Sequence, residues 1–149
     1  EQRPDEANII VMDQKADGLA SAVYQVVLSK NALMNVVASC WTEDQLDDYS
    51  ANAPEIIRQR LSSSQPGEST TDYFNRVIQD GLRGYSLKYY SVAPDFLRSA
   101  HAHLMGVYAW TVDDQASMMS SINAGFDGLI TGLPKMAQQM IILNQQLSR

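Results

Sequence analysis

The stretch Val107-Tyr-Ala-Trp-Thr-Val-Asp-Asp114, followed after one amphipathic segment by Gly125-Phe-Asp-Gly-Leu-Ile-Thr-Gly-Leu-Pro134, decides the fold of this chain. It begins with an apolar and aromatic run that is typical of a buried strand. Asp113 is placed to cap a following helix, and Gly125 is placed to close it. A second apolar run, Leu129-Ile130, then predicts another strand. Strand, helix and strand in this order indicate two parallel strands joined by a crossover helix.

The same alternation recurs along the chain. Strands are expected at Ile9–Met12, Val36–Ala38, Ile56–Leu61, Tyr85–Val92, Val107–Val112 and Leu129–Ile130. Helix starts are marked by a capping box from Thr42 to Gln45, by Thr71, by Pro94, which opens a helix expected to stop at Gly106, and by Pro134. About six such units predict an α/β fold with a parallel sheet. Because a complete eightfold barrel needs about 250 residues, the chain is expected to be a partial (β/α) barrel of the TIM type.

Composition limits the class of protein. A length of 149 residues with 45% apolar content suits a single domain over residues 1–149. The apolar runs are too short for a membrane-spanning helix. A net charge of −6 and scattered Lys and Arg residues argue against nucleic-acid binding. The single cysteine, Cys40, gives no evidence about redox compartment, and the location in the cell stays open.

Asp13-Gln-Lys15 ends the first expected strand. Residues two apart on a strand point to the same side, so both charged side chains would lie together at the carboxyl end, where barrel enzymes place their active sites. A carboxylate there suits a hard divalent cation, and a lysine suits a phosphate. From the residues alone, charged side chains at such a junction are more readily explained as a solvated end of the strand.

Several of these segments resemble the glycerophosphodiester phosphodiesterase family. The deciding stretch is similar to the family's closing strands, V-Y-x-W-T-V-[ND]-D and G-[VF]-D-G-[IL]-I-T-D-x-P. Asp13-Gln-Lys15 is similar to its E-x-K, with Asp for Glu. Val36–Thr42 resembles V-V-x-S-S-F-[DN], with Cys40 and Trp41 substituted. Gly132 stands where the family has an aspartate.

The resemblance implies roles for three residues. Asp13 would help to hold a divalent metal ion, calcium or magnesium, and Lys15 would contact the substrate phosphate. Trp110 would form an aromatic wall of the substrate pocket, although a strand tryptophan is by itself more often part of the core. No catalytic residue is expected on this chain. The family's acid–base histidines lie in opening motifs similar to H-R-G, E-N-T, E-x-D and H-D, and none of these occurs here.

The two histidines of the chain, His101 and His103, are two residues apart on an expected helix and cannot chelate one ion together. The hypothesis is therefore the carboxyl-terminal portion of a hydrolase that cleaves glycerophosphodiesters to sn-glycerol 3-phosphate and an alcohol. The start at Glu1 rather than Met fits part of a longer protein. A partial barrel exposes strand edges, so the missing segment or an oligomeric partner is expected to cover them.

Two alternatives remain open. A non-catalytic barrel remnant that serves as a binding or scaffold subunit would explain Asp13, Gly132 and the absent histidine motifs. A different metal-dependent barrel phosphodiesterase, acting on lysophospholipid or sphingomyelin, would share the same strand motifs.

Overall fold

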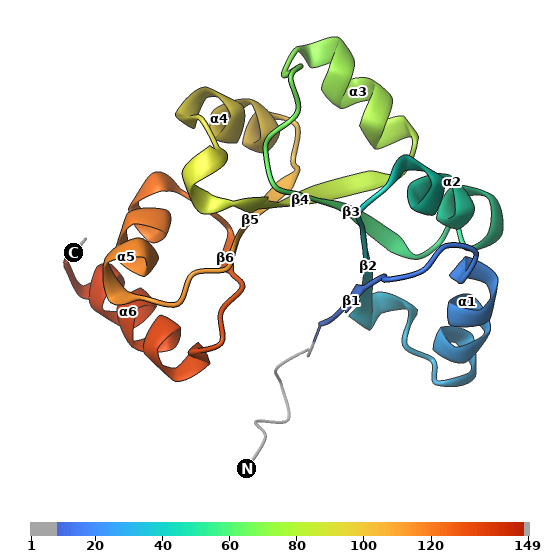
Figure 1. Ribbon diagram of the computed structural model, residues 1–149, viewed down its shortest axis with the longest axis horizontal. Helices are drawn as coiled ribbons and strands as arrows, with labels where there is room; N and C mark the ends of the chain where they lie inside the picture. Colours follow the sequence, from blue (N-terminus) through green and yellow to red (C-terminus); the bar gives the residue numbers. More distant parts are fainter. Residues whose placement is uncertain (1–8, 148–149) are drawn as a thin grey trace. The chain divides into compact units, whose positions relative to one another are not determined.

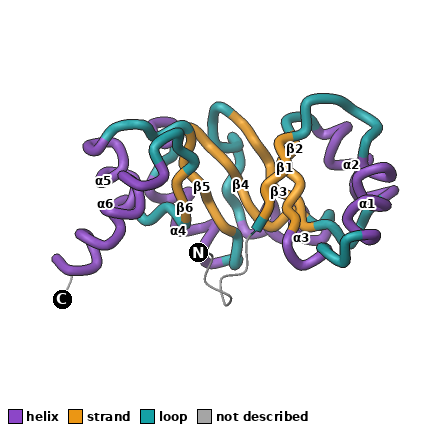
Figure 2. The backbone as a smooth tube through the Cα atoms, turned by 90° about the horizontal axis from the view of Figure 1, so that it is seen from below, coloured by secondary structure: helices purple, strands orange, loops and turns teal. Residues whose placement is uncertain are grey.

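The computed structural model describes residues 9–147, in which parallel strands alternate with helices (Figures 1 and 2). The strands are β1 (Ile10–Asp13), β2 (Val36–Cys40), β3 (Ile57–Ser62), β4 (Leu82–Lys88), β5 (Gly106–Trp110) and β6 (Gly128–Leu129). The α-helices are α1 (Ala20–Ser29), α2 (Glu43–Asn52), α3 (Thr71–Gln79), α4 (Pro94–Ala102), α5 (Gln115–Ala124) and α6 (Pro134–Leu147). Two short 3₁₀ helices are η1 (Leu33–Asn35) and η2 (Tyr89–Ser91). None of the described helices is long and apolar enough to span a bilayer.

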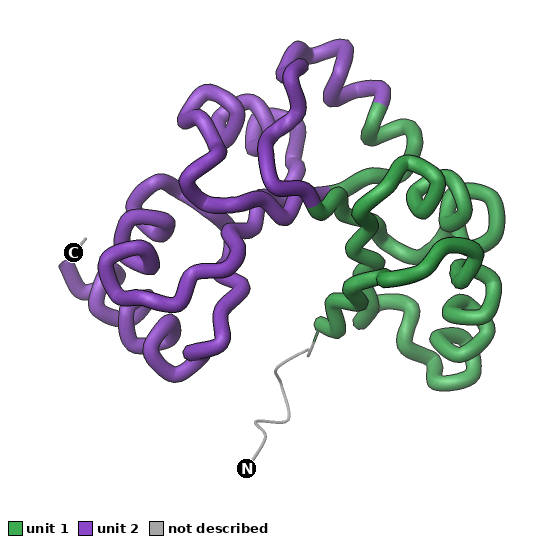
Figure 3. The backbone as a smooth tube through the Cα atoms, in the orientation of Figure 1, with its two compact units in different colours: residues 1–61, 77–83 green, residues 62–76, 84–149 purple. Residues whose placement is uncertain are grey.

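The chain divides into two compact units (Figure 3). Unit 1 comprises Glu1–Leu61 and Val77–Arg83, and unit 2 comprises Ser62–Arg76 and Gly84–Arg149. The chain therefore passes between the two units more than once. The expectation of one partial-barrel domain over residues 1–149 stays a prediction.

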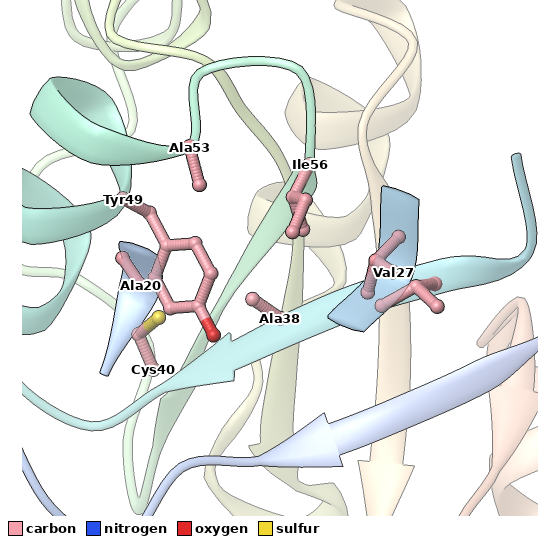
Figure 4. Close-up of a cluster of buried hydrophobic side chains, with 8 residues drawn as sticks. Ala20, Val27, Ala38, Cys40, Tyr49, Ala53 and Ile56 are labelled. Carbon is pink, nitrogen blue, oxygen red and sulfur yellow. The ribbon is translucent and has the colours of Figure 1, made fainter. Parts of the chain in front are cut away.

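Unit 1 contains three parallel strands, with β1 paired to β2 and β2 paired to β3. Helices α1 and α2 pack against each other, and the core lies between them and β2. Figure 4 shows Tyr49 reaching from α2 toward the strand that carries Ala38 and Cys40. All three side chains are almost fully buried. Small residues on the strand leave room for the tyrosine ring, which explains how two short helices cover this sheet.

A buried arginine joins distant parts of unit 1. Arg58 donates from Nη2 to the carbonyl of Asp80 at 2.9 Å and from Nη1 to those of Pro54 and Ile56, both at 3.4 Å. Burial lowers the pKa of its guanidinium from the ordinary value. Gly81 follows in a left-handed conformation (φ 87°), and a Cβ there would lie 1.7 Å from Arg58 Nη2. The turn into β4 therefore requires glycine for conformation and for space.

Unit 2 contains the rest of β4 with β5 and β6, again parallel. Its register places Lys88 opposite Trp110 at the carboxyl ends of β4 and β5. Helices α5 and α6 pack together, and a core cluster forms around Ala109, Val112 and Met118. The unit thus repeats the strand-and-helix plan of unit 1.

The helix caps confirm some predictions and correct others. The Oγ1 atom of Thr42 accepts from the backbone N–H of Gln45 at 3.2 Å, as the capping box predicts. Gly125 adopts the left-handed conformation that closes α5. The predictions of Asp113 and Thr71 as caps are wrong. Asp114 caps α5 by accepting from Ser117 N–H, which lowers the pKa of its carboxyl group. Thr70 accepts from the backbone N–H of Tyr73 at the start of α3.

Several predicted boundaries also differ, most of all those of β4, β5 and α4. β4 is Leu82–Lys88 rather than the expected Tyr85–Val92. It ends at Lys88 because the chain turns into η2 there, although the aromatic residues that follow continue the strand-like pattern. β5 ends at Trp110 rather than Val112. Helix α4 ends at Ala102 rather than at Gly106, because Leu104 takes a left-handed conformation (φ 58°) that breaks the helix first.

Candidate functional site

The carboxyl end of β1 carries the first candidate cluster, in unit 1. Asp13 accepts through Oδ2 from the ammonium of Lys15 and through Oδ1 from the indole Nε1 of Trp41 at 3.0 Å. The Lys15 ammonium lies 5.6 Å from the centroid of the Trp41 ring. Sequence reasoning brought Asp13 and Lys15 together but gave no role to Trp41. The tryptophan follows β2, and its position shows only once the two strands are in register.

The alternation along this strand end follows the predicted period of two. Asp13 and Lys15 are exposed, whereas Gln14 between them is 5% exposed. Both charged side chains are well solvated, so their ion pair contributes little to stability. Lys15 can therefore exchange its partner for another anion at small cost. Neither amide atom of Gln14 has a hydrogen-bond partner within residues 9–147.

The described residues do not form a complete metal site. Within residues 9–147, no group of three His, Cys, Asp or Glu side chains is positioned to hold one ion. The nearby carboxylate of Asp17 accepts from the Gln45 amide at 3.0 Å. Calcium takes six to eight oxygen ligands and magnesium six, so Asp13 supplies at most a small part of a site.

The carboxyl ends of β4 and β5 carry the second cluster, in unit 2. Trp110 is half-buried, and its indole Nε1 donates to the carbonyl of Ser86 at 2.9 Å. The ammonium of Lys88 lies 5.5 Å from the centroid of the Trp110 ring and 5.8 Å from that of Tyr90. Because its N–H is bonded to Ser86, the indole of Trp110 offers a ring face rather than a donor. Trp110 thus lies at the end of β5, before the predicted strand end at Val112, and its role in binding stays a prediction.

Sequence reasoning missed Lys88 and Tyr90. The expected strand ran on to Val92, which placed Lys88 in the middle of a strand rather than at its end. The signal that was present is a single lysine that directly precedes two tyrosines. Recognising it required the strand end, which the aromatic residues conceal.

Asp113 has a structural role at the end of β6 instead of the predicted cap. Its Oδ1 accepts from the hydroxyl of Thr131 at 2.9 Å and from the backbone N–H of Gly132 at 2.8 Å. These bonds tie the loop after β5 to the loop after β6. A side chain at position 132 would begin 3.6 Å from this oxygen, so an aspartate here would bring two carboxylates together.

Neither histidine lies with the Trp110 cluster of unit 2. His101 Nε2 is 2.9 Å from the carboxylate of Asp127, which also accepts from the backbone N–H of Val107 at the amino end of β5. His103 stacks on the ring of Phe74, with 4.8 Å between ring centroids. Both histidines therefore hold unit 2 together at the end of the strands opposite to Trp110. Cys40 is fully buried, and burial raises the pKa of its thiol to about 11, which does not suit a nucleophile.

Comparisons with known proteins bear on the family and the fold of the chain. The sequence matches the family model of the glycerophosphoryl diester phosphodiesterases over residues 4–136. No curated protein matches the chain significantly.

Several solved structures have a similar fold. A Silicibacter pomeroyi protein of the glycerophosphoryl diester phosphodiesterase type is 21% identical, with a TM-score of 0.79 over 93% of this chain and 52% of its own. A Parabacteroides distasonis glycerophosphodiester phosphodiesterase is 18% identical, with a TM-score of 0.76 over 92% of this chain and 58% of its own. An Oleispira antarctica phosphodiesterase, solved with its product sn-glycerol 3-phosphate, is 20% identical, with a TM-score of 0.67. The match covers 87% of this chain and 53% of the Oleispira chain.

The chain spans about half the length of these structures. Its six βα units form part of a TIM-type (β/α) barrel, and the predicted fold class is confirmed.

Proposed function

The chain belongs to the glycerophosphoryl diester phosphodiesterase family, and on that premise we propose that it is part of a hydrolase that cleaves glycerophosphodiesters to sn-glycerol 3-phosphate and an alcohol. The observation that carries the proposal is the cluster of Asp13, Lys15 and Trp41 at a strand's carboxyl end. In barrels of this type, the carboxyl ends of the strands carry the active site.

Lys15 is proposed to bind the phosphate of the substrate. Its side chain is 71% exposed and pairs only with the exposed Asp13 among the described residues. The ring of Trp41 below it limits the directions that the ammonium can take. An incoming phosphodiester can accept from the remaining N–H groups while Asp13 keeps the lysine in place. In unit 2, Trp110 is proposed to provide a flat apolar wall for the glycerol or alcohol part.

The acid and base of the reaction are proposed to come from outside this chain. Phosphodiester cleavage requires a proton to be taken from water and another to be given to the leaving alcohol. His101 and His103 are engaged at the opposite end of the strands of unit 2. We therefore assign this chemistry to a longer protein or a partner chain, in keeping with the half-length coverage of the solved relatives.

Two further expectations accompany this proposal. Calcium or magnesium would bind with Asp13 as one ligand, and the other ligands would come from the same additional segment. That segment, or an oligomeric partner, would also cover β1, where Ile10 is 55% and Val11 50% exposed. An exposed apolar strand at the margin of a unit favours such a covering.

The test is turnover of glycerophosphodiesters by the complete protein that contains this chain. Lys15→Ala should lower kcat/KM by about a hundredfold, because a charge-assisted bond to the transferring phosphate is lost. Lys30→Ala is the matched control, because Lys30 is an exposed lysine at the end of α1. Activity of Lys15→Ala equal to that of the control would remove the role of Lys15.

A scaffold function remains the second candidate. It is favoured by the engagement of both histidines in contacts within unit 2. The two functions differ in what accompanies the chain. An intact-mass and native-mass measurement that finds only this polypeptide or its symmetric oligomer, without activity, would favour the scaffold.

A further inference from the structure

We propose that Lys88 selects the alcohol group of the substrate, favouring a phosphodiester whose alcohol carries an anionic group over one that carries a quaternary ammonium. This inference rests on the proposed function and deepens it. It concerns only the cluster at the carboxyl ends of β4 and β5, which contains Lys88, Tyr90 and Trp110.

The position of Lys88 is fixed by the sheet. It is the last residue of β4 and lies opposite Trp110 in the parallel register. The next residues turn into η2, which brings the ring of Tyr90 to 5.8 Å from the ammonium. The ammonium thus lies within 6 Å of the centroids of two aromatic rings, a distance at which ring faces attract cations.

The charge of Lys88 is not neutralised by a neighbouring side chain. Within residues 9–147, no carboxylate lies within 4.0 Å of its ammonium, in contrast to Lys15, which pairs with Asp13. Within the same residues the ammonium donates no side-chain hydrogen bond, and the bond from Ser91 Oγ goes to the backbone carbonyl of Lys88. A partly buried ammonium with three unused donors suits a carboxylate or a second phosphate on the ligand.

The same arrangement disfavours a choline group. A quaternary ammonium binds in proteins by lying on aromatic faces. Here Lys88 already lies near the faces of Trp110 and Tyr90. A second cation at this place would meet a like charge and would have to displace the lysine. Removing the lysine should therefore open an aromatic site for choline.

The experiment uses NMR titration of the ¹⁵N-labelled 149-residue chain. Its two tryptophans give one indole N–H signal each, and the spectrum of Trp41→Phe assigns them. The probes are glycerophosphoinositol 4-phosphate, whose alcohol carries a second phosphate, and glycerophosphocholine. We expect the Trp110 signal to respond to the anionic probe with about tenfold higher affinity, equivalent to about 1.4 kcal/mol.

Three variants separate charge from shape. Lys88→Met keeps a long apolar side chain and should lose the preference, with glycerophosphocholine binding at least as tightly as the anionic probe. Lys88→Arg keeps the cation and should retain the preference. Lys135→Met removes one charge from an exposed position in α6 of the same unit and should leave the preference unchanged.

Equal or tighter binding of glycerophosphocholine to the unsubstituted chain would overturn the inference. An unchanged preference in Lys88→Met, or a silent Trp110 signal, would do the same. The Trp41 signal reports separately on the Asp13 and Lys15 cluster. If it responds to sn-glycerol 3-phosphate while Trp110 shows no preference, the inference fails and the proposed function stands. If Trp110 discriminates while Trp41 is silent, the proposed function fails and the anion preference stands.

Discussion

Asp13 and Trp41 are joined by a hydrogen bond of 3.0 Å from the indole Nε1 to the carboxylate Oδ1, although they follow different strands of unit 1. The second oxygen of the carboxylate accepts from Lys15. Both oxygens of the proposed metal ligand are thus engaged by donors. A metal ion would compete with these donors for the lone pairs of the two oxygens.

This competition predicts weak metal binding by the chain alone. One carboxylate supplies too few ligands for calcium or magnesium, so we expect a dissociation constant of about 1 mM or weaker in isothermal titration calorimetry. Trp41→Phe removes the competing donor and keeps an aromatic ring near Lys15. It should tighten binding by no more than about tenfold. Micromolar binding that disappears in Asp13→Ala would contradict this expectation.

Two of the buried glutamines of unit 1, Gln14 and Gln45, should respond oppositely to substitution by methionine. The Gln14 amide is buried without a partner in the described part of the chain, which costs about 1–3 kcal/mol. Gln14→Met should therefore raise the free energy of unfolding by about 1 kcal/mol. Gln45 accepts from the backbone N–H of Trp41 at 2.8 Å and donates to Asp17. Gln45→Met should lower stability by about 1–2 kcal/mol.

Urea unfolding of both variants at neutral pH provides the measurement. A similar loss in Gln14→Met and Gln45→Met would show that the Gln14 amide is satisfied in solution.

Two glycines separate backbone strain from steric clash. Both Gly81 and Gly125 have a left-handed backbone, with φ of 87° and 93°. A Cβ at Gly125 meets nothing within 4 Å, so Gly125→Ala should cost only the conformational strain of about 1–2 kcal/mol. Gly81→Ala also displaces the Arg58 guanidinium and should cost at least about 3 kcal/mol. Equal urea midpoints for the two variants would refute the clash with Arg58.

Alkaline pH should destabilise unit 1 through its core. Burial raises the pKa of Cys40 from 9.0 to about 11 and, with the nearby Cys40 and Asp48, that of Tyr49 from 10.0 to about 12. The folded chain then holds these protons more tightly than the unfolded chain. The stability linked to Cys40 is fully present below pH 9 and is lost as pH rises toward 11.

The check is the free energy of unfolding, from urea curves at pH 8, 9, 10, 11 and 12. In Cys40→Ala, the free energy of unfolding should fall less between pH 9 and 11 than it does in the unsubstituted chain. The loss of the sulfur lowers stability at every pH and does not affect this comparison. In Tyr49→Phe, the free energy of unfolding should fall less between pH 10 and 12 than it does in the unsubstituted chain. A pH profile of Cys40→Ala parallel to that of the unsubstituted chain would argue against a protonated thiol as the source.

The sequence predicted the order of strands and helices well, because apolar periodicity and capping residues act over a few neighbouring positions. It failed by one residue at two caps, where adjacent residues have the same chemistry. Asp113 and Asp114, like Thr70 and Thr71, are equivalent as local caps. What separates the aspartates is a contact with Thr131 and Gly132 in a later loop, which local reasoning does not include.

The candidate site was predicted in part for a similar reason. Asp13 and Lys15 are neighbours in sequence, so the two-residue period of a strand brings them together. Trp41 and Lys88 are recognised as members of the two clusters only when the strand register and the strand ends are known. The family resemblance supplied Trp110, but the lysine near its ring has no counterpart in the motifs that carried that resemblance.

Arg58 also determines where the chain can be cut. Its guanidinium is held by carbonyl groups near the start of β3 and by that of Asp80, on the far side of the loop and helix that lead to β4. A truncation after Leu61, the end of the first continuous segment, would leave a buried cation without its shortest bond. Residues 77–83 are therefore as necessary for the autonomous folding of unit 1 as the strands that precede them.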